Sequence, residues 1–322
     1  MSILTGAKKN VLFVDDEEAI VNSLKLLFRR QKKFNVITTT NQQEALDIVD
    51  QNEIHVVVSD MRMPGMSGAE LLLHVKEKSP NTMRILLTGY AEMENIIKSI
   101  NTGEVYRFLE KPWSNSDLKT KITEAVDISS TLWESEQQGT GEKTLSELSS
   151  NNTTGSLLFV GDNESNILEK ITSHFEQVEI HSANNLQKAV SLLAKNDDIL
   201  TIIVQATTYY HSTVSLLKIL KAEFPMLVSI VIANDKDSKL AMQLVNEAQV
   251  FRYLTEPMEK EKLYRHVQQA LQYSATLRIS PVLVKRHAVE EISEEEKTKI
   301  LDIIGISFLA NIGKRFSNLF GR

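Results

Sequence analysis

Residues 11–17 read VLFVDDE, a short apolar run that ends abruptly in three acidic residues. An apolar run of this length is typical of a strand that is buried on both faces of a sheet. The following segment, Glu17–Arg30, has apolar residues at helical spacing, namely Ile20, Leu24, Leu27 and Phe28. A buried strand followed directly by an amphipathic helix predicts the repeating unit of a parallel α/β sheet.

The same alternation continues to about residue 133. Further strands are predicted over Phe34–Thr39, His55–Ser59, Arg84–Leu87 and Val105–Leu109. Further helices are predicted over Gln42–Asp50, Ala69–Lys78, Glu92–Ile100 and Ser114–Trp133. The pattern therefore predicts a doubly wound sheet of five parallel strands.

The chain also repeats itself. VLFVDDE at residue 11 recurs as LLFVGDN at residue 157, and YRFLEKP at residue 106 recurs as FRYLTEP at residue 251. The strands Leu157–Val160, Thr201–Val204 and Ser229–Ile232 continue the second copy. We therefore predict a first domain over residues 1–133, a linker over 134–156, a second domain over 157–277 and a helical tail over 278–322.

Composition narrows the classes of function. The net charge of −6 gives no overall attraction to phosphates, so nucleic acid is not expected as a partner. The absence of cysteine excludes disulfides, thiolate metal sites and a thiol nucleophile, and it fits a cytoplasmic protein. The sequence also lacks an apolar run of membrane-spanning length.

Polar residues gather where the predicted strands of the first copy end. Asp15 and Asp16 follow the first strand, Asp60 follows the third, Thr88 the fourth and Lys111 the fifth. Ligands bind beyond the carboxyl ends of the strands in such sheets. Three carboxylates at one edge repel each other, so we expect a cation among them, and Mg²⁺ prefers such oxygen ligands. An aspartate in this setting is a candidate nucleophile for phosphoryl transfer.

The motifs DD, DMRMPGMSG, TG and KP together resemble the receiver domain of bacterial two-component response regulators, over Asn10 to about Ser130. The resemblance implies flavodoxin-like (βα)5 domains and Mg²⁺ as cofactor. It also implies roles for seven positions. Asp60 is the phosphoacceptor, Asp15, Asp16 and Asp60 hold Mg²⁺ with the backbone carbonyl of Arg62, and Thr88, Tyr106 and Lys111 contact the phosphoryl group or switch with it.

By the same resemblance, the donor is a histidine kinase or a histidine phosphotransfer protein, and output runs through contacts with a protein partner. A homodimer is one arrangement that this allows. The protein is then not an enzyme beyond slow self-dephosphorylation. Two alternatives stay open: a Mg²⁺-dependent phosphatase that uses the same aspartates on an outside substrate, and a scaffold that works without phosphorylation.

The second copy lacks the acids and the lysine of the first. Gly161, Gln205, Ala233 and Glu256 stand at the positions of Asp15, Asp60, Thr88 and Lys111, and only Asp162 persists. Neither an amide nor an anion at these positions supports the chemistry. The second copy is therefore expected to be a degenerate receiver, or pseudo-receiver, that keeps the fold and binds partners.

The tail carries two apolar stretches. A helix is predicted over Ile292–Ile304. Further on, six apolar residues fall on one predicted helical face: Phe308, Leu309, Ile312, Phe316, Leu319 and Phe320. This face is expected to pack on the protein's own domains, to dock into another protein, or to lie on a membrane surface.

Overall fold

The computed structural model describes most of the chain in two compact units, Met1–Gly141 (unit 1) and Glu142–Arg322 (unit 2). Described residues are 8–89, 93–103, 105–137, 155–162, 166–206, 210–234, 237–289, 292–293, 295 and 297–298. The side chains of 93, 94, 103 and 210–212 are not described. Most of the predicted tail, including the stretch from Phe308 to Phe320, lies outside the described residues.

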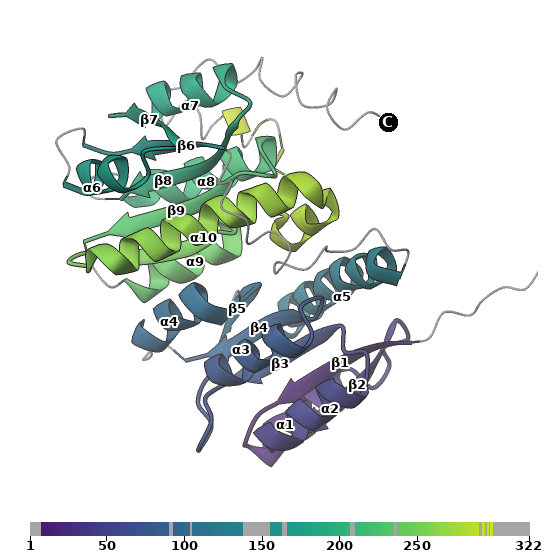
Figure 1. Ribbon diagram of the computed structural model, residues 1–322. Helices are drawn as coiled ribbons and strands as arrows, with labels where there is room; N and C mark the ends of the chain where they lie inside the picture. Colours follow the sequence, from purple (N-terminus) through teal and green to yellow (C-terminus); the bar gives the residue numbers. More distant parts are fainter. Residues whose placement is uncertain are drawn as a thin grey trace, which may run out of the picture. The chain divides into compact units, whose positions relative to one another are not determined.

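Unit 1 is a sheet of five parallel strands in the order β2-β1-β3-β4-β5 (Figure 1). The strands are β1 Lys9–Val14, β2 Phe34–Thr39, β3 Val56–Asp60, β4 Met83–Thr88 and β5 Arg107–Glu110. The helices are α1 Glu18–Leu27, α2 Gln42–Gln51, α3 Gly68–Lys78, α4 Met93–Gly103 and α5 Asn115–Gln137. The chain moves from β1 toward one edge of the sheet to form β2 and then toward the other edge through β3, β4 and β5. Because the crossovers are right-handed, this reversal puts α1 and α5 on one face and α2, α3 and α4 on the other.

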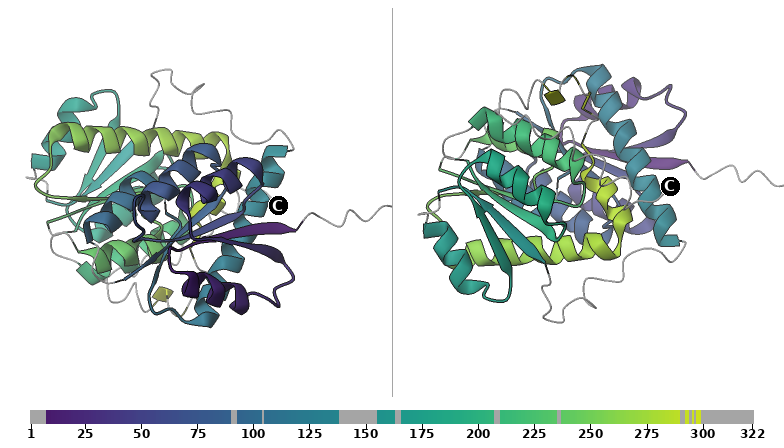
Figure 2. Two further views of the ribbon diagram at one scale, coloured as in Figure 1. Left: turned by 90° about the horizontal axis from the view of Figure 1, so that it is seen from below. Right: turned by 90° about the horizontal axis from the view of Figure 1, so that it is seen from above.

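Unit 2 has the same strand order when its sheet is followed from the opposite edge, β7-β6-β8-β9-β10. Its strands are β6 Ser156–Val160, β7 Glu179–Ala183, β8 Ile199–Gln205, β9 Val228–Ala233 and β10 Arg252–Thr255. Its helices are α6 Asn166–His174, α7 Leu186–Lys195, α8 Tyr210–Glu223, α9 Ser238–Ala248, α10 Lys260–Ile279 and the 3₁₀ helix η1 Pro281–His287. Figure 2 lets the helices of this unit be followed on both faces of its sheet.

Many element boundaries differ from the sequence prediction by a few residues, including those of β5 and α5. β5 begins at Arg107 rather than at Val105, because the ladder with β4 starts at the pair Ile85–Arg107. Tyr106 precedes it and donates its backbone N–H to the Arg84 carbonyl at 2.8 Å. Helix α5 runs on to Gln137, so four residues of the segment expected to be linker are helical.

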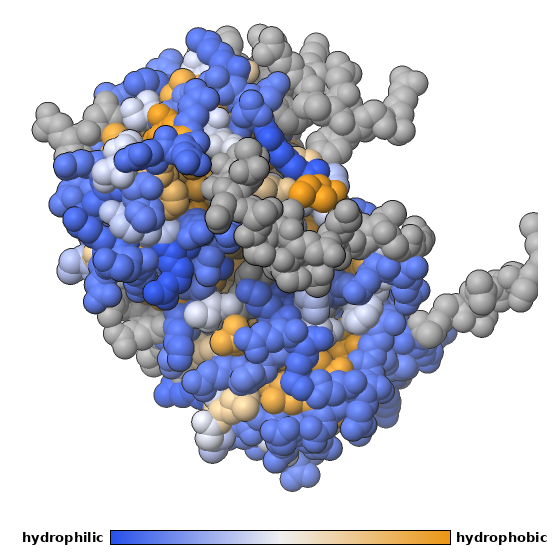
Figure 3. Space-filling view, viewed as in Figure 1, coloured by the Kyte–Doolittle hydropathy of each residue, from blue (hydrophilic) through white to orange (hydrophobic). Residues whose placement is uncertain are grey.

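The central strands supply the core of each unit. Val11, Leu12 and Phe13 in unit 1 and Leu157, Leu158 and Phe159 in unit 2 are all 0% exposed. β1 and β6 hold equivalent positions in the two sheets, and helices cover both faces of each sheet. The same apolar stretch therefore recurs in the sequence of both strands. The outer surface is mostly hydrophilic on the face that Figure 3 draws. Among the described residues, no helix is long and apolar enough to cross a membrane.

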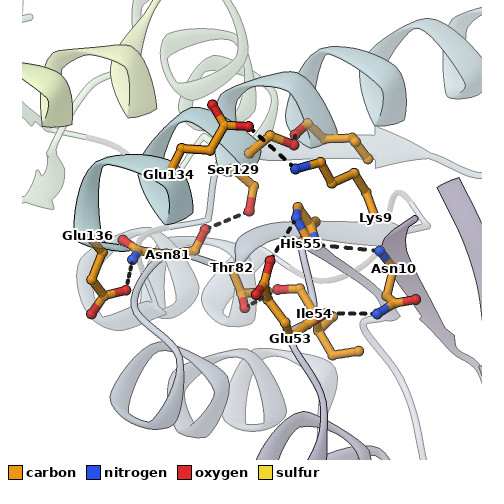
Figure 4. A network of polar contacts seen from close by, with 12 residues as sticks. Lys9, Asn10, Glu53, Ile54, His55, Asn81, Thr82, Ser129, Glu134 and Glu136 are labelled. Atoms are coloured by element: carbon orange, nitrogen blue, oxygen red, sulfur yellow. Dashed lines mark hydrogen bonds and ion pairs between the residues drawn. The ribbon is translucent and has the colours of Figure 1, made fainter. Parts of the chain in front are cut away.

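A polar network at the amino ends of the strands attaches the second half of α5 to unit 1 (Figure 4). Ser129 donates its hydroxyl to the Asn81 carbonyl at 2.9 Å, and Lys9 pairs with Glu134 at 3.5 Å. His55 lies within this network and is 2% exposed. Burial, helped by the charge of Lys9, lowers the pKa of His55 to about 4. The imidazole is therefore neutral at physiological pH.

Candidate functional site

Three of the predicted site residues meet at the carboxyl ends of the unit 1 strands. Asp15 follows β1, Asp60 is the last residue of β3, and Lys111 follows β5. The Lys111 ammonium donates to Asp15 Oδ2 at 2.9 Å and pairs with Asp60 Oδ1 at 2.5 Å. One lysine thus bridges two carboxylates that come from separate strands.

The backbone fixes the orientation of both carboxylates. Asp15 Oδ1 accepts from the Glu17 N–H at 3.0 Å, and Asp60 Oδ2 accepts from the Arg62 N–H at 3.0 Å. Each aspartate therefore gives one oxygen to a backbone amide two residues on, and the other to Lys111.

The lysine resolves an electrostatic conflict. Asp15 is 0% exposed and Asp60 is 7% exposed, so two buried carboxylates share one small volume. Burial raises the pKa of Asp60, with a further contribution from the charge of Asp15, while Lys111 and the Arg62 amide oppose the rise. Burial alone would depress the pKa of Lys111, but its bonds to Asp60 and Asp15 raise it above the usual lysine value. The ammonium therefore stays charged, and Asp60 is more basic than an ordinary aspartate.

Gly68, to which the sequence pattern assigned no role, allows this arrangement. A Cβ on Gly68 would lie 1.9 Å from the Asp60 carbonyl oxygen, so only glycine allows the start of α3 to approach the end of β3. The Gly68 N–H donates to the Met61 carbonyl at 3.0 Å. Ser67 and Glu70 form a capping box that begins α3 at this point. The close approach could have been suspected from the final glycine of DMRMPGMSG.

Thr88 and Tyr106 are both buried, at 1% and 5% exposure. The Thr88 hydroxyl donates to the Gly89 carbonyl at 3.0 Å, and the Thr88 carbonyl accepts from the Lys111 N–H at 2.8 Å. The Tyr106 ring lies 4.2 Å from the Arg107 guanidinium carbon. The backbone of Thr88 therefore positions Lys111, while the hydroxyl of Thr88 contacts its own strand end.

The donor chemistry of the site fits Mg²⁺ in part. Asp15 and Asp60 present carboxylate oxygens to the same small volume, which is the ligand type that Mg²⁺ takes. Asp16, the third expected ligand, is exposed. Within the described part of the chain, no group of three or more acidic or imidazole side chains is arranged to hold a metal. The tight trio of acids expected from the sequence is instead a pair bridged by Lys111, which offsets part of their negative charge.

The equivalent edge of unit 2 is filled by an amide. Gln205 is the last residue of β8, and its Nε2 donates to Glu256 Oε2 at 3.4 Å. A Cβ on Gly161 would lie 2.7 Å from Gln205 Oε1 and 2.9 Å from Gln205 Cβ, so the Gln205 side chain uses the space that an aspartate at position 161 would need. Gln205 Oε1 is buried without a hydrogen-bond partner among the described residues. Ala233 is buried and Asp162 is exposed.

Comparison with known proteins assigns the first unit. Residues 11–123 match the family model of the response regulator receiver domain. The chain is 32% identical over 124 residues to the hydrogenase transcriptional regulatory protein HoxA of Cupriavidus necator, covering 38% of this chain and 25% of HoxA. It is 29% identical over 122 residues to sporulation initiation phosphotransferase F of Bacillus subtilis, covering 38% of this chain and 97% of the relative.

Among solved structures, the signal receiver domain of an HD domain-containing protein from Pseudomonas fluorescens Pf-5 is 30% identical. That match covers 42% of this chain and 98% of the other, with a TM-score of 0.39. The chain spans about a quarter of the length of the HoxA relatives. Unit 1 thus contains a response regulator receiver domain, and the matches support a response regulator of a two-component phosphorelay with one such domain.

Proposed function

We propose that the chain accepts a phosphoryl group on Asp60 and signals through contacts with other proteins. The single observation that carries the proposal is the bridge from Lys111 to Asp15 and Asp60 at the carboxyl edge of the unit 1 sheet. It holds Asp60 beside a fixed cation, and the Arg62 amide orients the carboxylate. A nucleophile and a stabilising positive charge are the two elements that phosphoryl transfer requires.

In the proposed reaction, a carboxylate oxygen of Asp60 attacks the phosphorus of a phosphohistidine on the donor. A P–O bond to Asp60 forms as the P–N bond breaks, and the electron pair of that bond stays on the imidazole nitrogen. Lys111 stays beside the carboxylate and balances the charge of the phosphoryl oxygens. Thr88 and Tyr106 respond by changing the position of the hydroxyl and the ring, which is the proposed switch.

We assign Mg²⁺ to Asp15, Asp16, Asp60 and the Arg62 carbonyl. When bound, it would supply positive charge that offsets the negative charge of the phosphoryl oxygens. The exposed Asp16 must turn toward the site for this ligand set to be complete. The backbone amide of Glu17 orients the carboxylate of Asp15, which supports its assignment to this ligand set.

We infer that unit 2 is a pseudo-receiver. Support comes from the shared strand order and from the replacement of the site residues by Gly161, Gln205, Ala233 and Glu256. The proposed donor is a histidine kinase or a phosphotransfer protein in the cytoplasm. The output partner is a protein, and we propose no catalytic role beyond slow loss of the phosphoryl group.

Labelling of the full chain tests the proposal. Acetyl phosphate with Mg²⁺ should add one phosphoryl group to the wild-type protein, and intact mass with peptide mapping should place it on Asp60. Asp60→Asn should abolish the label, whereas Gln205→Ala should leave it unchanged.

Label that persists in Asp60→Asn, or that maps to residues 155–289, would overturn the proposal. Repeated turnover of an added phosphomonoester would favour the phosphatase alternative. A phosphorylation-independent scaffold would instead bind the same partners before and after treatment.

A further inference from the structure

A pocket of about 420 Å³ opens in unit 2 at the amino ends of its strands. Its lining comes from the end of α7, the start of β8, the loop between α8 and β9, and the end of α10. Apolar residues dominate the lining: Leu193, Ile199, Leu200, Phe224, Met226 and Leu227. This edge of the sheet is opposite to the one that carries Gly161 and Gln205. The pocket is therefore separate from the degenerate phosphorylation site.

The floor and the rim of the pocket differ in character. Leu193 and Phe224 are 1% and 6% exposed and form the buried part of the lining, while Met226 is partly exposed. Ile279, next to the rim residue Arg278, is 58% exposed. A concave pocket lined mainly by apolar side chains with a few polar groups is typical of a binding site.

The described chain ends close to this pocket. Lys297 is 8% exposed and forms an ion pair with Glu223, the last residue of α8. Glu223 directly precedes Phe224 of the pocket floor. Each further residue extends the chain by at most about 3.3–3.6 Å, so the residues just after Thr298 lie within reach of the pocket.

The sequence after Thr298 combines aliphatic side chains, which suit the apolar lining of the pocket, with basic side chains, which suit its acidic rim. Within six residues it offers Ile300, Leu301, Ile303 and Ile304. Residues 299–322 contain four basic side chains and one acidic one, Asp302. The pocket rim includes Asp197 and Asp198, and the latter already pairs with Arg278 at 2.6 Å. Apolar surface and charge therefore match between the segment and the pocket.

We propose that the unit 2 pocket binds residues 299–322 of the same chain, with the aliphatic side chains near Ile303 inserted between α7 and the α8–β9 loop. Docking would bury apolar surface on both sides and place basic residues near the acidic rim. The proposal gives the second unit a binding role that does not depend on phosphorylation of Asp60.

Introduced cysteines test the contact in the full chain, which has no cysteine of its own. The pair Leu200→Cys with Ile303→Cys should form an intramolecular disulfide under mild oxidation. A matched pair, Ser173→Cys with Ile303→Cys, places the partner on an exposed position of α6 and should form it several-fold less. Equal yields from the two pairs would overturn the proposal, and so would disulfides that join two molecules.

A peptide competition keeps the test independent of oxidation. Both tryptophans, Trp113 and Trp133, lie in unit 1, so Met226→Trp in a chain cut after Thr298 reports on the pocket separately. A peptide of residues 299–322 should shift that fluorescence and should not shift it when Leu193→Asp is also present. A tethered segment has an effective concentration of the order of 1 mM. A Kd of about 100 μM for the free peptide therefore suffices for the docked form to exceed the undocked form roughly tenfold.

A fluorescence signal that does not change up to about 1 mM peptide would overturn the proposal. Binding of the full chain to phosphatidylserine vesicles that needs residues 299–322, with equal crosslinking of both cysteine pairs, would assign the segment to a membrane surface instead.

Discussion

Asp60 in unit 1 and Gln205 in unit 2 end equivalent central strands, but their surroundings are opposite in character. Asp60 faces Lys111 across 2.5 Å, and its other oxygen accepts from the backbone. Gln205 reaches Glu256 at 3.4 Å and leaves Oε1 buried without a partner among the described residues. At the first edge a lysine thus bridges two carboxylates, whereas at the second edge the Gln205 side chain occupies the space.

The backbone of the two edges is nevertheless the same. The Lys111 N–H donates to Thr88 and the Glu256 N–H donates to Ala233, at 2.8 and 2.9 Å. Both positions precede a cis proline. Arg107 and Arg252 each lie over the aromatic ring that precedes them, at 4.2 and 3.8 Å. The fold therefore depends on strand pairing and buried apolar surface, and the site charges are added to it.

The largest expected effect is the loss of the bridging lysine. Lys111→Gln leaves two buried carboxylates without a cation, and we expect unit 1 to lose about 2–4 kcal/mol of unfolding free energy at neutral pH. Mg²⁺ should restore most of it, because an ion that binds only the folded state stabilises that state. Hydrogen exchange of residues 8–137 with and without Mg²⁺ measures both changes.

Glu256→Gln is the matched variant in unit 2 and should change stability by less than about 0.5 kcal/mol. If Lys111→Gln proves equally harmless, the lysine does not offset repulsion between Asp15 and Asp60, and the contrast between the two edges fails.

Acid should weaken both units through one buried histidine each. Burial lowers the pKa of His55 in unit 1 and of His266 in unit 2 to about 4, from an ordinary 6.5. The unfolded chain then binds more protons, so stability present above pH 6.5 is lost as the pH falls toward 4. At about 1.36 kcal/mol per pKa unit, the loss approaches about 3 kcal/mol per histidine.

Denaturant unfolding of the full chain at pH 7, 6 and 5 measures the slope of the unfolding free energy against pH. His55→Gln should flatten the slope of unit 1 alone, while His74→Gln should leave it unchanged, because His74 is 47% exposed at its side chain. A slope that does not respond to His55→Gln would mean that another group controls acid stability.

The smallest expected effect tests whether Gln205 fills the degenerate site. Gly161→Ala places a Cβ within 3.0 Å of Gln205 and Phe159, and we expect unit 2 to lose about 1–2 kcal/mol. Adding Gln205→Ala should relieve part of the loss, with a coupling of about 0.5–2 kcal/mol between the two positions. Hydrogen exchange of β6 and β8 in the four proteins of the cycle gives that coupling, and an additive result would show that the two side chains do not compete.

The sequence alone predicted much of this protein. Alternating apolar runs and amphipathic helices predicted five parallel strands per unit, and the order of both sheets is the doubly wound one. The repeat predicted two such units, because the same strand must be buried in each. Asp15, Asp60 and Lys111 were expected at one edge, since carboxyl ends of parallel strands meet there, and the structure places them together.

Other features follow only from contacts between distant residues. The extension of α5 past Trp133 depends on the contacts of Ser129 with Asn81 and of Glu134 with Lys9. The local sequence pattern of the helix does not predict these contacts. The need for Gly68 depends on the close approach of α3 to β3, where a Cβ at this position would lie 1.9 Å from the Asp60 carbonyl oxygen. The exposure of Asp16 beside the buried Asp15 also depends on how the chain turns after β1.

Periodicity and composition thus determined the fold and the edge at which charged residues gather, because burial acts on every residue of a strand or helix face. Tertiary structure decided which oxygens face the lysine, which side chain fills the edge of unit 2, and where a pocket opens. Those features are set by a few ångström between residues up to 96 positions apart in the chain, as Asp15 and Lys111 are. Sequence spacing carries no information on such distances until the strands are paired.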